Sequence, residues 1–231
     1  MQYLIDASVY VFRAYYSMPD DMVDDAGNPI NALYGFCRFL GDFMEQVTPE
    51  YVAIAFDESL SSSFRTQIYP EYKANRDPAP EELKRQFAQC RRFTNALGLL
   101  AWGSPRYEAD DLIGSLSRQA EGGGLETIIV SGDLDMLQLV SEHTKLMTTR
   151  LGVQSTVIYD PERIHERYGL SPSQMVDFKA LKGDSTDNIP GIAGVGDKTA
   201  AKLLTTFGSL DEAYARIDEV KPDKLRAKLV D

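Results

Sequence analysis

Residues 127–135 read TIIVSGDLD, a run of β-branched residues that stops at serine and glycine and delivers two aspartates. The apolar run predicts a buried strand, and the polar residues after it predict a turn at its carboxyl end. The same arrangement occurs twice more, in MQYLID (1–6) and in YVAIAFD (51–57). If these three strands are parallel, their aspartates lie at one edge of a single sheet.

The rest of the first 160 residues continues this alternation. Further strand-like runs are GLLAW (98–102), KLMTT (145–149) and STVIY (155–159), and helical patterns cover 30–47, 109–120 and 136–140. Alternating strands and helices predict an α/β fold with a mostly parallel central sheet flanked by helices. Active sites in such sheets gather at the carboxyl ends of the strands. The stretch 59–85, with three prolines, is expected to be long and irregular.

From about residue 161 the strand signals end, and the sequence predicts a helical module over 161–231. Ser171 and Pro172 are a good N-cap and first residue for a helix that runs to about residue 182. A glycine-rich turn follows, then a helix at about 198–207 and another from about 210. We expect a core of residues 1–160 and a helical module of residues 161–231.

Charge and composition limit the partners and the compartment. The net charge of −11 disfavours nucleic acid, but residues 65–92 carry seven basic and four acidic residues, a local net charge of +3. Cations bound among the other acids would reduce the repulsion further. The two cysteines lack metal-type spacing, and no signal peptide or apolar run of about 20 residues is present. We therefore expect a cytoplasmic protein with no membrane partner.

Nine carboxylates fall where they can share one cleft. They are Asp6, Asp57, Glu108, Asp110, Asp111, Asp133, Asp135, Asp184 and Asp187. Each stretch taken alone is more often a turn or a helix cap. Together they would repel one another unless cations lie among them, and oxygen ligands select Mg²⁺ or Mn²⁺. Zinc is disfavoured, because both histidines, His143 and His165, lie outside these stretches. Two ions about 4 Å apart would suit phosphodiester cleavage.

The run GIAGVGDKT (191–199) looks like a phosphate-binding turn. It is not a nucleotide-triphosphate loop, because Asp197 precedes Lys198 and no strand leads into it. Gly191, Gly194 and Gly196 would let backbone N–H groups point towards a phosphate of a nucleic-acid backbone. The alternative is an ordinary corner between two helices.

In these residues the chain resembles the bacterial and phage 5′-nuclease family, which includes the 5′–3′ exonuclease domain of DNA polymerase I and the flap endonucleases. The matching stretches cover nearly the whole chain: LIDAS (4–8), FRAYY (12–16), AFD (55–57), YPEYKANR (69–76), YEADD (107–111), SGDLDMLQLV (131–140), FKALKGDSTDNIPG (178–191) and GVGDKTA (194–200). The resemblance implies a PIN-like nuclease fold with a helical arch at about 59–92 and a helix–three-turn–helix at about 183–208. It also implies metal-dependent hydrolysis of DNA at 5′ ends and 5′ flaps.

The resemblance assigns roles to individual residues. One metal ion would draw on Asp6, Asp57, Glu108, Asp110 and Asp111, and the other on Asp133, Asp135, Asp184 and Asp187. Lys73 and Arg76 in the arch would contact the scissile phosphate, Tyr72 would stack on an unpaired base, and Arg13 would meet the strand near the cleft. The turn residues Gly191, Gly194, Gly196, Lys198 and Thr199 would bind the backbone of duplex DNA, with a potassium ion as in relatives.

The sequence departs from the family at two positions, because many relatives have proline where Ala193 and Asp197 stand. Asp197 adds a negative charge close to the expected DNA. The expected partner is DNA with a 5′ flap, a 5′ overhang or a single-strand/double-strand junction, bound by a monomer. The main alternative is a DNA-junction binding protein without useful catalysis. A ribonuclease of the related small acidic-site nucleases ranks lower, because those lack the arch and the glycine turn.

Overall fold

The computed structural model of this chain describes residues 1–58, 63–149 and 156–230. The chain forms two compact units. The first comprises Met1–Gln67 and Asp77–Asp160, and the second comprises Ile68–Arg76 and Pro161–Asp231.

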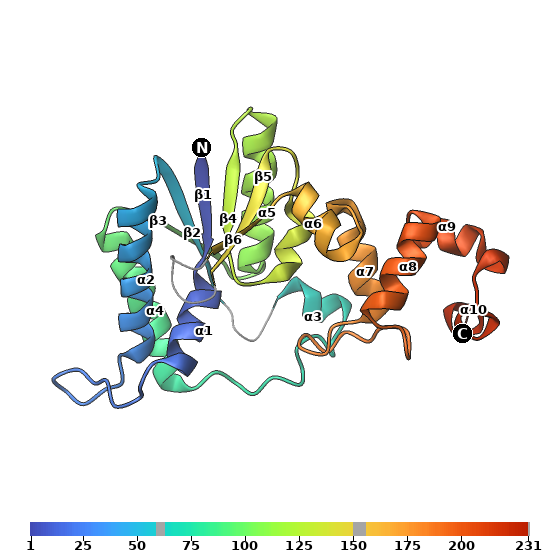
Figure 1. The fold of residues 1–231 in the computed structure, drawn as a ribbon. Coiled ribbons are helices and arrows are strands. Elements are labelled where there is room, and N and C mark those ends of the chain that lie inside the picture. Colours follow the sequence, from blue (N-terminus) through green and yellow to red (C-terminus); the bar gives the residue numbers. More distant parts are fainter. Residues whose placement is uncertain (59–62, 150–155, 231) are drawn as a thin grey trace. The chain divides into compact units, whose positions relative to one another are not determined.

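A six-stranded sheet forms the centre of the first unit (Figure 1). Its strands are β1 (Gln2–Asp6), β2 (Tyr51–Asp57), β3 (Leu100–Ser104), β4 (Thr127–Val130), β5 (Thr144–Thr149) and β6 (Thr156–Tyr159), in the spatial order β3-β2-β1-β4-β5-β6. All neighbouring pairs are parallel except β5 and β6, which are antiparallel. The expected mostly parallel α/β sheet is therefore confirmed.

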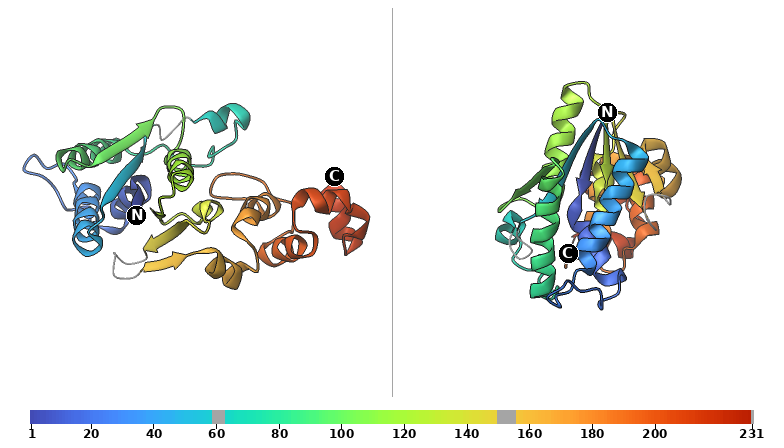
Figure 2. Two further views of the ribbon diagram at one scale, coloured as in Figure 1. Left: turned by 90° about the horizontal axis from the view of Figure 1, so that it is seen from above. Right: turned by 90° about the vertical axis from the view of Figure 1, so that its left-hand side faces the viewer.

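Helices cover both faces of this sheet, as the views in Figure 2 show. Helices α1 (Ala7–Ser17), α2 (Asn31–Val47) and α4 (Glu81–Ala96) pack on one face, and α5 (Ala109–Gly122) packs on the other. The short helix α3 (Phe64–Ile68) and the 3₁₀ helix η1 (Leu134–Leu139) complete the unit. The right-handed crossovers of parallel strands place helices on the two faces in this way.

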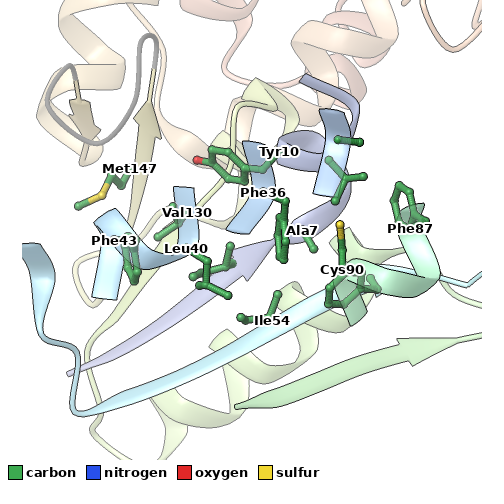
Figure 3. Packing of buried hydrophobic residues seen from close by; sticks show 14 of the residues in the cluster. Ala7, Tyr10, Phe36, Leu40, Phe43, Ile54, Phe87, Cys90, Val130 and Met147 are labelled. Carbon is green, nitrogen blue, oxygen red and sulfur yellow. The ribbon is translucent and has the colours of Figure 1, made fainter. Parts of the chain in front are cut away.

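The core of the unit lies between the sheet and the α1–α2–α4 layer (Figure 3). Phe36, Leu40 and Phe43 of α2 are fully buried against strand residues that include Ile54 and Val130. Burying side chains of this size is worth roughly 1.5–3 kcal/mol each. The core therefore fixes the positions at which β1, β2 and β4 end.

All six strands were predicted, although Ser155 of the STVIY run lies outside the described residues. The expectation of an irregular stretch over 59–85 was wrong at its end, because α4 begins at Glu81 and buries Leu83, Phe87 and Cys90. Its prolines precede the helix instead of interrupting it, since Pro80 is the N-cap residue. Residues 136–140 were expected to be α-helical, but η1 is a 3₁₀ helix that ends at Leu139.

The arch expected at about 59–92 is divided in the structure. Residues 59–62 lie outside the described residues. Ile68–Arg76 belongs to the second unit, whereas α4 is part of the core of the first. Whether the intervening segment forms an arch around a DNA strand stays a prediction.

The second unit is helical where the structure describes it. It contains α6 (Pro161–Tyr168), η2 (Pro172–Gln174), α7 (Met175–Lys182), α8 (Asp197–Phe207), α9 (Leu210–Ala215), η3 (Ile217–Glu219) and α10 (Asp223–Val230). Ser171 and Gln174 form a capping box, and Pro172 follows the N-cap as expected, but the expected helix begins as the 3₁₀ helix η2 and becomes α-helical only at Met175. Across the described ranges, no helix has the length and apolar character needed to cross a membrane.

Candidate active site

The site begins where the strand order of the sheet reverses. The chain runs from β1 outward to β2 and β3 and then returns to the other side of β1 as β4, so the switch point lies between β1 and β4. Crevices at such points bind ligands in open α/β sheets. Asp6 at the end of β1 is 2% exposed and accepts a hydrogen bond from Ser131 Oγ at 2.9 Å, directly after β4. Burial, followed by the nearby Asp57 carboxylate, raises the pKa of Asp6 to about 7.

Asp57 links the end of β2 to the start of α5. Its Oδ1 accepts a hydrogen bond from the backbone N–H of Ala109 at 2.8 Å, and its own N–H donates to Ser8 Oγ at 3.1 Å. The positive end of a helix dipole favours a carboxylate at this position. The contact therefore brings the first turn of α5 to the carboxyl edge of the sheet.

The acids of the YEADD motif occupy that first turn. Glu108 is the N-cap residue, and Asp111 Oδ2 accepts the Glu108 N–H at 3.0 Å, as in a capping box. Arg65 Nη1 and Nη2 donate to Asp111 Oδ2 and Oδ1 at 2.7 and 2.8 Å, and Glu108 Oε2 lies 4.0 Å from Nη1. Sequence reasoning missed Arg65, which neutralises part of this charge.

Asp110 has no such compensation. Burial raises the pKa of Asp110 well above its ordinary value, and the nearby charges of Asp6, Asp133, Asp57 and Glu108 raise it further. Among the described residues, no hydrogen bond or ion pair reaches its carboxylate. A buried acid among four others is the position at which a cation would relieve most repulsion.

Asp133 and Asp135 follow β4. Asp133 is the N-cap of η1, where its Oδ1 accepts the Asp135 N–H at 2.8 Å. The Asp133 N–H donates to Ser131 Oγ at 3.0 Å. Ser131 thus joins Asp6 to Asp133, and sequence reasoning missed this role although the serine stands in the SGD turn.

In the second unit, Asp184 and Asp187 occupy one turn after α7. Asp184 accepts hydrogen bonds from Lys179 Nζ at 2.7 Å and from the Thr186 N–H at 2.8 Å. Burial raises the pKa of Asp184, but these donors outweigh it, so the pKa lies below its usual value. Asp187 accepts hydrogen bonds from Tyr72 and from Arg76.

The donor chemistry of these groups fits a hard divalent cation, because every candidate ligand is a carboxylate oxygen. Within the described ranges, no three side chains of His, Cys, Asp or Glu stand close enough together to hold one ion. Asp57, Asp111 and Asp133 each turn an oxygen towards a protein donor. Asp110 fits a cation best, because its carboxyl group is buried and its pKa is raised.

Comparison with known proteins places this geometry in a family. A family model described as 5′-3′ exonuclease, N-terminal resolvase-like domain, matches residues 1–169. The chain belongs to the 5′–3′ exonuclease family. A second model of that family, described as the C-terminal SAM fold, matches residues 170–231. The resemblance found in the sequence is confirmed.

Relatives of this 5′–3′ exonuclease chain are DNA polymerases I. The Bacillus caldotenax enzyme is 41% identical over 226 residues, which cover 98% of this chain and 26% of the relative. The Mycobacterium tuberculosis enzyme is 43% identical over 230 residues, which cover 98% of this chain and 25% of the relative. The chain therefore spans about a quarter of the length of these relatives.

Solved structures share the exonuclease fold. The T5 D15 protein co-crystallised with metal ions superimposes with a TM-score of 0.78 at 17% identity, covering 99% of this chain and 83% of that one. The catalytic core of Rad2 in complex with DNA substrate superimposes with a TM-score of 0.63 at 20% identity, covering 99% of this chain and 70% of that one. These likenesses support the fold.

Two residues predicted to meet DNA in this exonuclease domain are engaged by protein groups. Arg13 Nη1 donates to the Thr149 carbonyl at 2.6 Å and to Thr149 Oγ1 at 3.0 Å, and its guanidinium lies over the Tyr10 ring. An added Cβ at Gly132 would lie 2.5 Å from Arg13 Nη2, so the guanidinium is beside the SGD turn. Tyr72 is 7% exposed, so its ring meets a base only if its segment moves.

The glycines of the second exonuclease module differ from one another. An added Cβ at Gly191 would lie 2.2 Å from the Lys182 carbonyl carbon, so this glycine permits close backbone packing. Gly194 has φ +80°, and Gly196 has open space around it. Lys198 is exposed and Thr199 is half-buried at the start of α8. Lys228, which sequence reasoning missed, donates to the Ala193 carbonyl beside them.

Proposed function

We propose that this chain is a metal-dependent, structure-specific 5′-nuclease that hydrolyses DNA phosphodiester bonds at 5′ ends and 5′ flaps. One observation carries the proposal: in a chain of the 5′–3′ exonuclease family, the ends of β1, β2 and β4 and the first turn of α5 bring acids to the switch point of the sheet. Asp6 and Asp110 are buried there with raised pKa values. This crowding of acids favours a site that binds cations.

The family resemblance divides the acids into two metal sets. Asp6, Asp57, Glu108, Asp110 and Asp111 would hold one divalent ion, and Asp133, Asp135, Asp184 and Asp187 would hold the other. Mg²⁺ or Mn²⁺ held there would activate water and offset charge that develops on the phosphate. Ser131 and the Ala109 N–H would orient Asp6 and Asp57 for this role.

Basic side chains would position the DNA. Lys73 and Arg76 would contact the scissile phosphate and stabilise its developing charge. Arg13, held by Thr149, would present its remaining donors to the strand. Gly194, Gly196, Lys198 and Thr199 at the start of α8 would bind the duplex backbone, with Gly191 shaping the turn and a potassium ion there as in relatives.

The substrates that suit this arrangement are duplexes with a 5′ flap, a 5′ overhang or a junction between single and double strands. The test uses a labelled 5′-flap duplex incubated with the protein and Mg²⁺ or Mn²⁺. We expect shortened products that carry a 5′-phosphate. Folded protein that yields no product with either ion would contradict the proposal.

The alternative is a junction-binding protein in which catalysis has lapsed. The presence of all nine acids favours the nuclease. We expect Asp133→Ala to abolish cleavage and leave flap binding nearly unchanged. Asp42→Ala is the matched control, because Asp42 is an acid on α2 that pairs with exposed Arg38 at 4.0 Å. Cleavage that persists in Asp133→Ala would show that the site assignment is wrong.

A further inference from the structure

Two segments of the second unit, more than a hundred residues apart in sequence, are joined by hydrogen bonds. The Lys73 N–H donates to the Asp187 carbonyl at 2.9 Å. Asn75 Nδ2 donates to the Ser185 carbonyl at 2.8 Å, and Asn188 Nδ2 donates to the Glu71 carbonyl at 2.7 Å. The segment 69–76 therefore lies along the turn 185–188.

This pairing also occupies the carboxylate of Asp187. Arg76 Nη2 forms an ion pair with Asp187 Oδ1, and Tyr72 OH donates to Oδ2 at 3.2 Å. Arg76 Nε donates to the Thr186 carbonyl at 3.2 Å, which fixes the guanidinium at this turn. Both oxygens of Asp187 are thus bound by donors from segment 69–76.

The same three side chains have different tasks in the proposed function. Asp187 would be a metal ligand, Arg76 would contact the scissile phosphate and Tyr72 would stack on a base. While Arg76 lies on Asp187, its Nη2 and Nε are turned to this turn and away from a phosphate, and Tyr72 cannot stack while it is 7% exposed with Lys73 Nζ 4.8 Å above its ring. In the observed arrangement, therefore, both oxygens of Asp187 are taken by protein donors, two nitrogens of Arg76 are engaged and the ring of Tyr72 is covered.

We propose that segment 69–76 is a latch, in which Arg76 serves as the internal counterion of Asp187 until a divalent cation replaces it. The inference rests on the proposed function. Cation binding would remove the partner of Arg76 and Tyr72 and release both side chains for DNA. Binding of one cation would then both fill the metal site and free segment 69–76 to bind phosphate.

The strength of the contact suits a reversible latch. The side chain of Arg76 is 46% exposed, and ion pairs with such exposure are weak. Lys73 has φ 56° and Asn188 has φ 57°, so each segment contains a residue in the left-handed region at the contact. Such conformations cost energy that neighbouring contacts must offset, which lowers the free energy needed to open the contact.

The first test measures Mn²⁺ binding without DNA, by the electron paramagnetic resonance signal of the free ion. Asp187→Asn identifies the binding class that depends on Asp187. We expect Arg76→Gln to tighten that class by about two- to fivefold, the range that an exposed ion pair supplies. Tyr72→Phe should give a smaller gain. Lys182→Gln is the matched control, because Lys182 is a cation of the same unit that pairs with Asp197 at 2.7 Å.

The second test follows hydrogen exchange in the peptide 69–76. We expect Mn²⁺ to speed exchange at the Lys73 amide, because its acceptor is the Asp187 carbonyl. Unchanged or slower exchange on ion binding would overturn the latch, as would unchanged affinity in Arg76→Gln or a lack of any Asp187-dependent binding class. The two failures are distinguishable because cleavage is not among these readouts. Unchanged affinity in Arg76→Gln, with an Asp187-dependent class present, overturns only the latch, whereas a lack of that class also contradicts the assignment of Asp187 as a metal ligand.

Discussion

Ser131 Oγ donates to Asp6 Oδ2 at 2.9 Å and accepts the Asp133 N–H at 3.0 Å, so one buried hydroxyl joins the ends of two neighbouring strands. The hydrogen bond from Ser131 lowers the pKa of Asp6, which burial and Asp57 raise. Ser131 therefore favours the ionised form of an acid that its surroundings would otherwise protonate.

Ser131→Ala should shift the acid limb of cleavage to higher pH, because Asp6 loses a donor and its pKa rises. The variant should also lose about 1–3 kcal/mol of unfolding free energy, since two polar groups lose their partner. Cleavage measured from pH 6 to 9, with urea unfolding alongside, checks both effects. Ser141→Ala is the control, because Ser141 makes similar bonds to Glu121, His143 and Thr144. A pH profile identical to that of the unmodified protein would refute the role of Ser131.

The stability of the metal-free protein should fall as pH rises, because the pKa of Asp6 is raised from 3.8 to about 7 on folding. The folded state holds the Asp6 proton more tightly, so the penalty is absent below the unfolded pKa and complete above the folded one. It amounts to at most on the order of 4 kcal/mol. Urea unfolding in EDTA between pH 5 and 8 should therefore show a smaller decline in Asp6→Asn. Equal declines in both proteins would contradict this account.

Arg65 should matter through its two-point contact with Asp111 and not through its charge alone. Arg65→Lys keeps the charge but cannot reproduce both hydrogen bonds, so cleavage should fall although stability is largely kept. Arg65→Ala should cost about 1–2 kcal/mol of unfolding free energy, because the pair is partly buried.

Flap cleavage and urea unfolding of these Arg65 variants provide the measurement. Arg216→Lys is the control, since Arg216 makes a two-point contact with Glu219 on an exposed surface. Full cleavage by Arg65→Lys would show that charge suffices.

Gly191 and Gly196 should respond differently to alanine. A Cβ at Gly191 would meet the backbone of Lys182 and Gly183 at 2.2 and 2.3 Å, so Gly191→Ala should cost about 2 kcal/mol or more. Gly196 has nothing within 4 Å of its added Cβ, so Gly196→Ala should change stability by less than about 0.5 kcal/mol.

Thermal unfolding and duplex binding separate the two glycines. If the turn holds a phosphate, Gly196→Ala should weaken binding to duplex DNA without a change in stability. A loss of stability in Gly196→Ala, or unchanged stability in Gly191→Ala, would contradict the packing around these two glycines.

Much of the fold followed from local pattern. The strand runs and the aspartates that end them indicated a parallel sheet with acids at its carboxyl edge, and β1, β2 and β4 confirm that sheet. Helix α4 was missed because the prolines that precede it suggested an irregular segment, whereas its buried Leu83 and Phe87 secure it against α2. The residues of α4 themselves favour a helix, with Glu81 and Glu82 in its first turn, so the local signal was misread and not overridden.

The sequence by itself determined which residue types end each strand and begin each helix, because periodicity and turn chemistry act over a few neighbours. Only the tertiary structure decided which protein group each acid meets: Ser131 for Asp6, Arg65 for Asp111, and Arg76 for Asp187. These partners lie 125, 46 and 111 residues apart. The physical reason is that chain folding, and not spacing along the sequence, sets the distance between an acid and its hydrogen-bond donor.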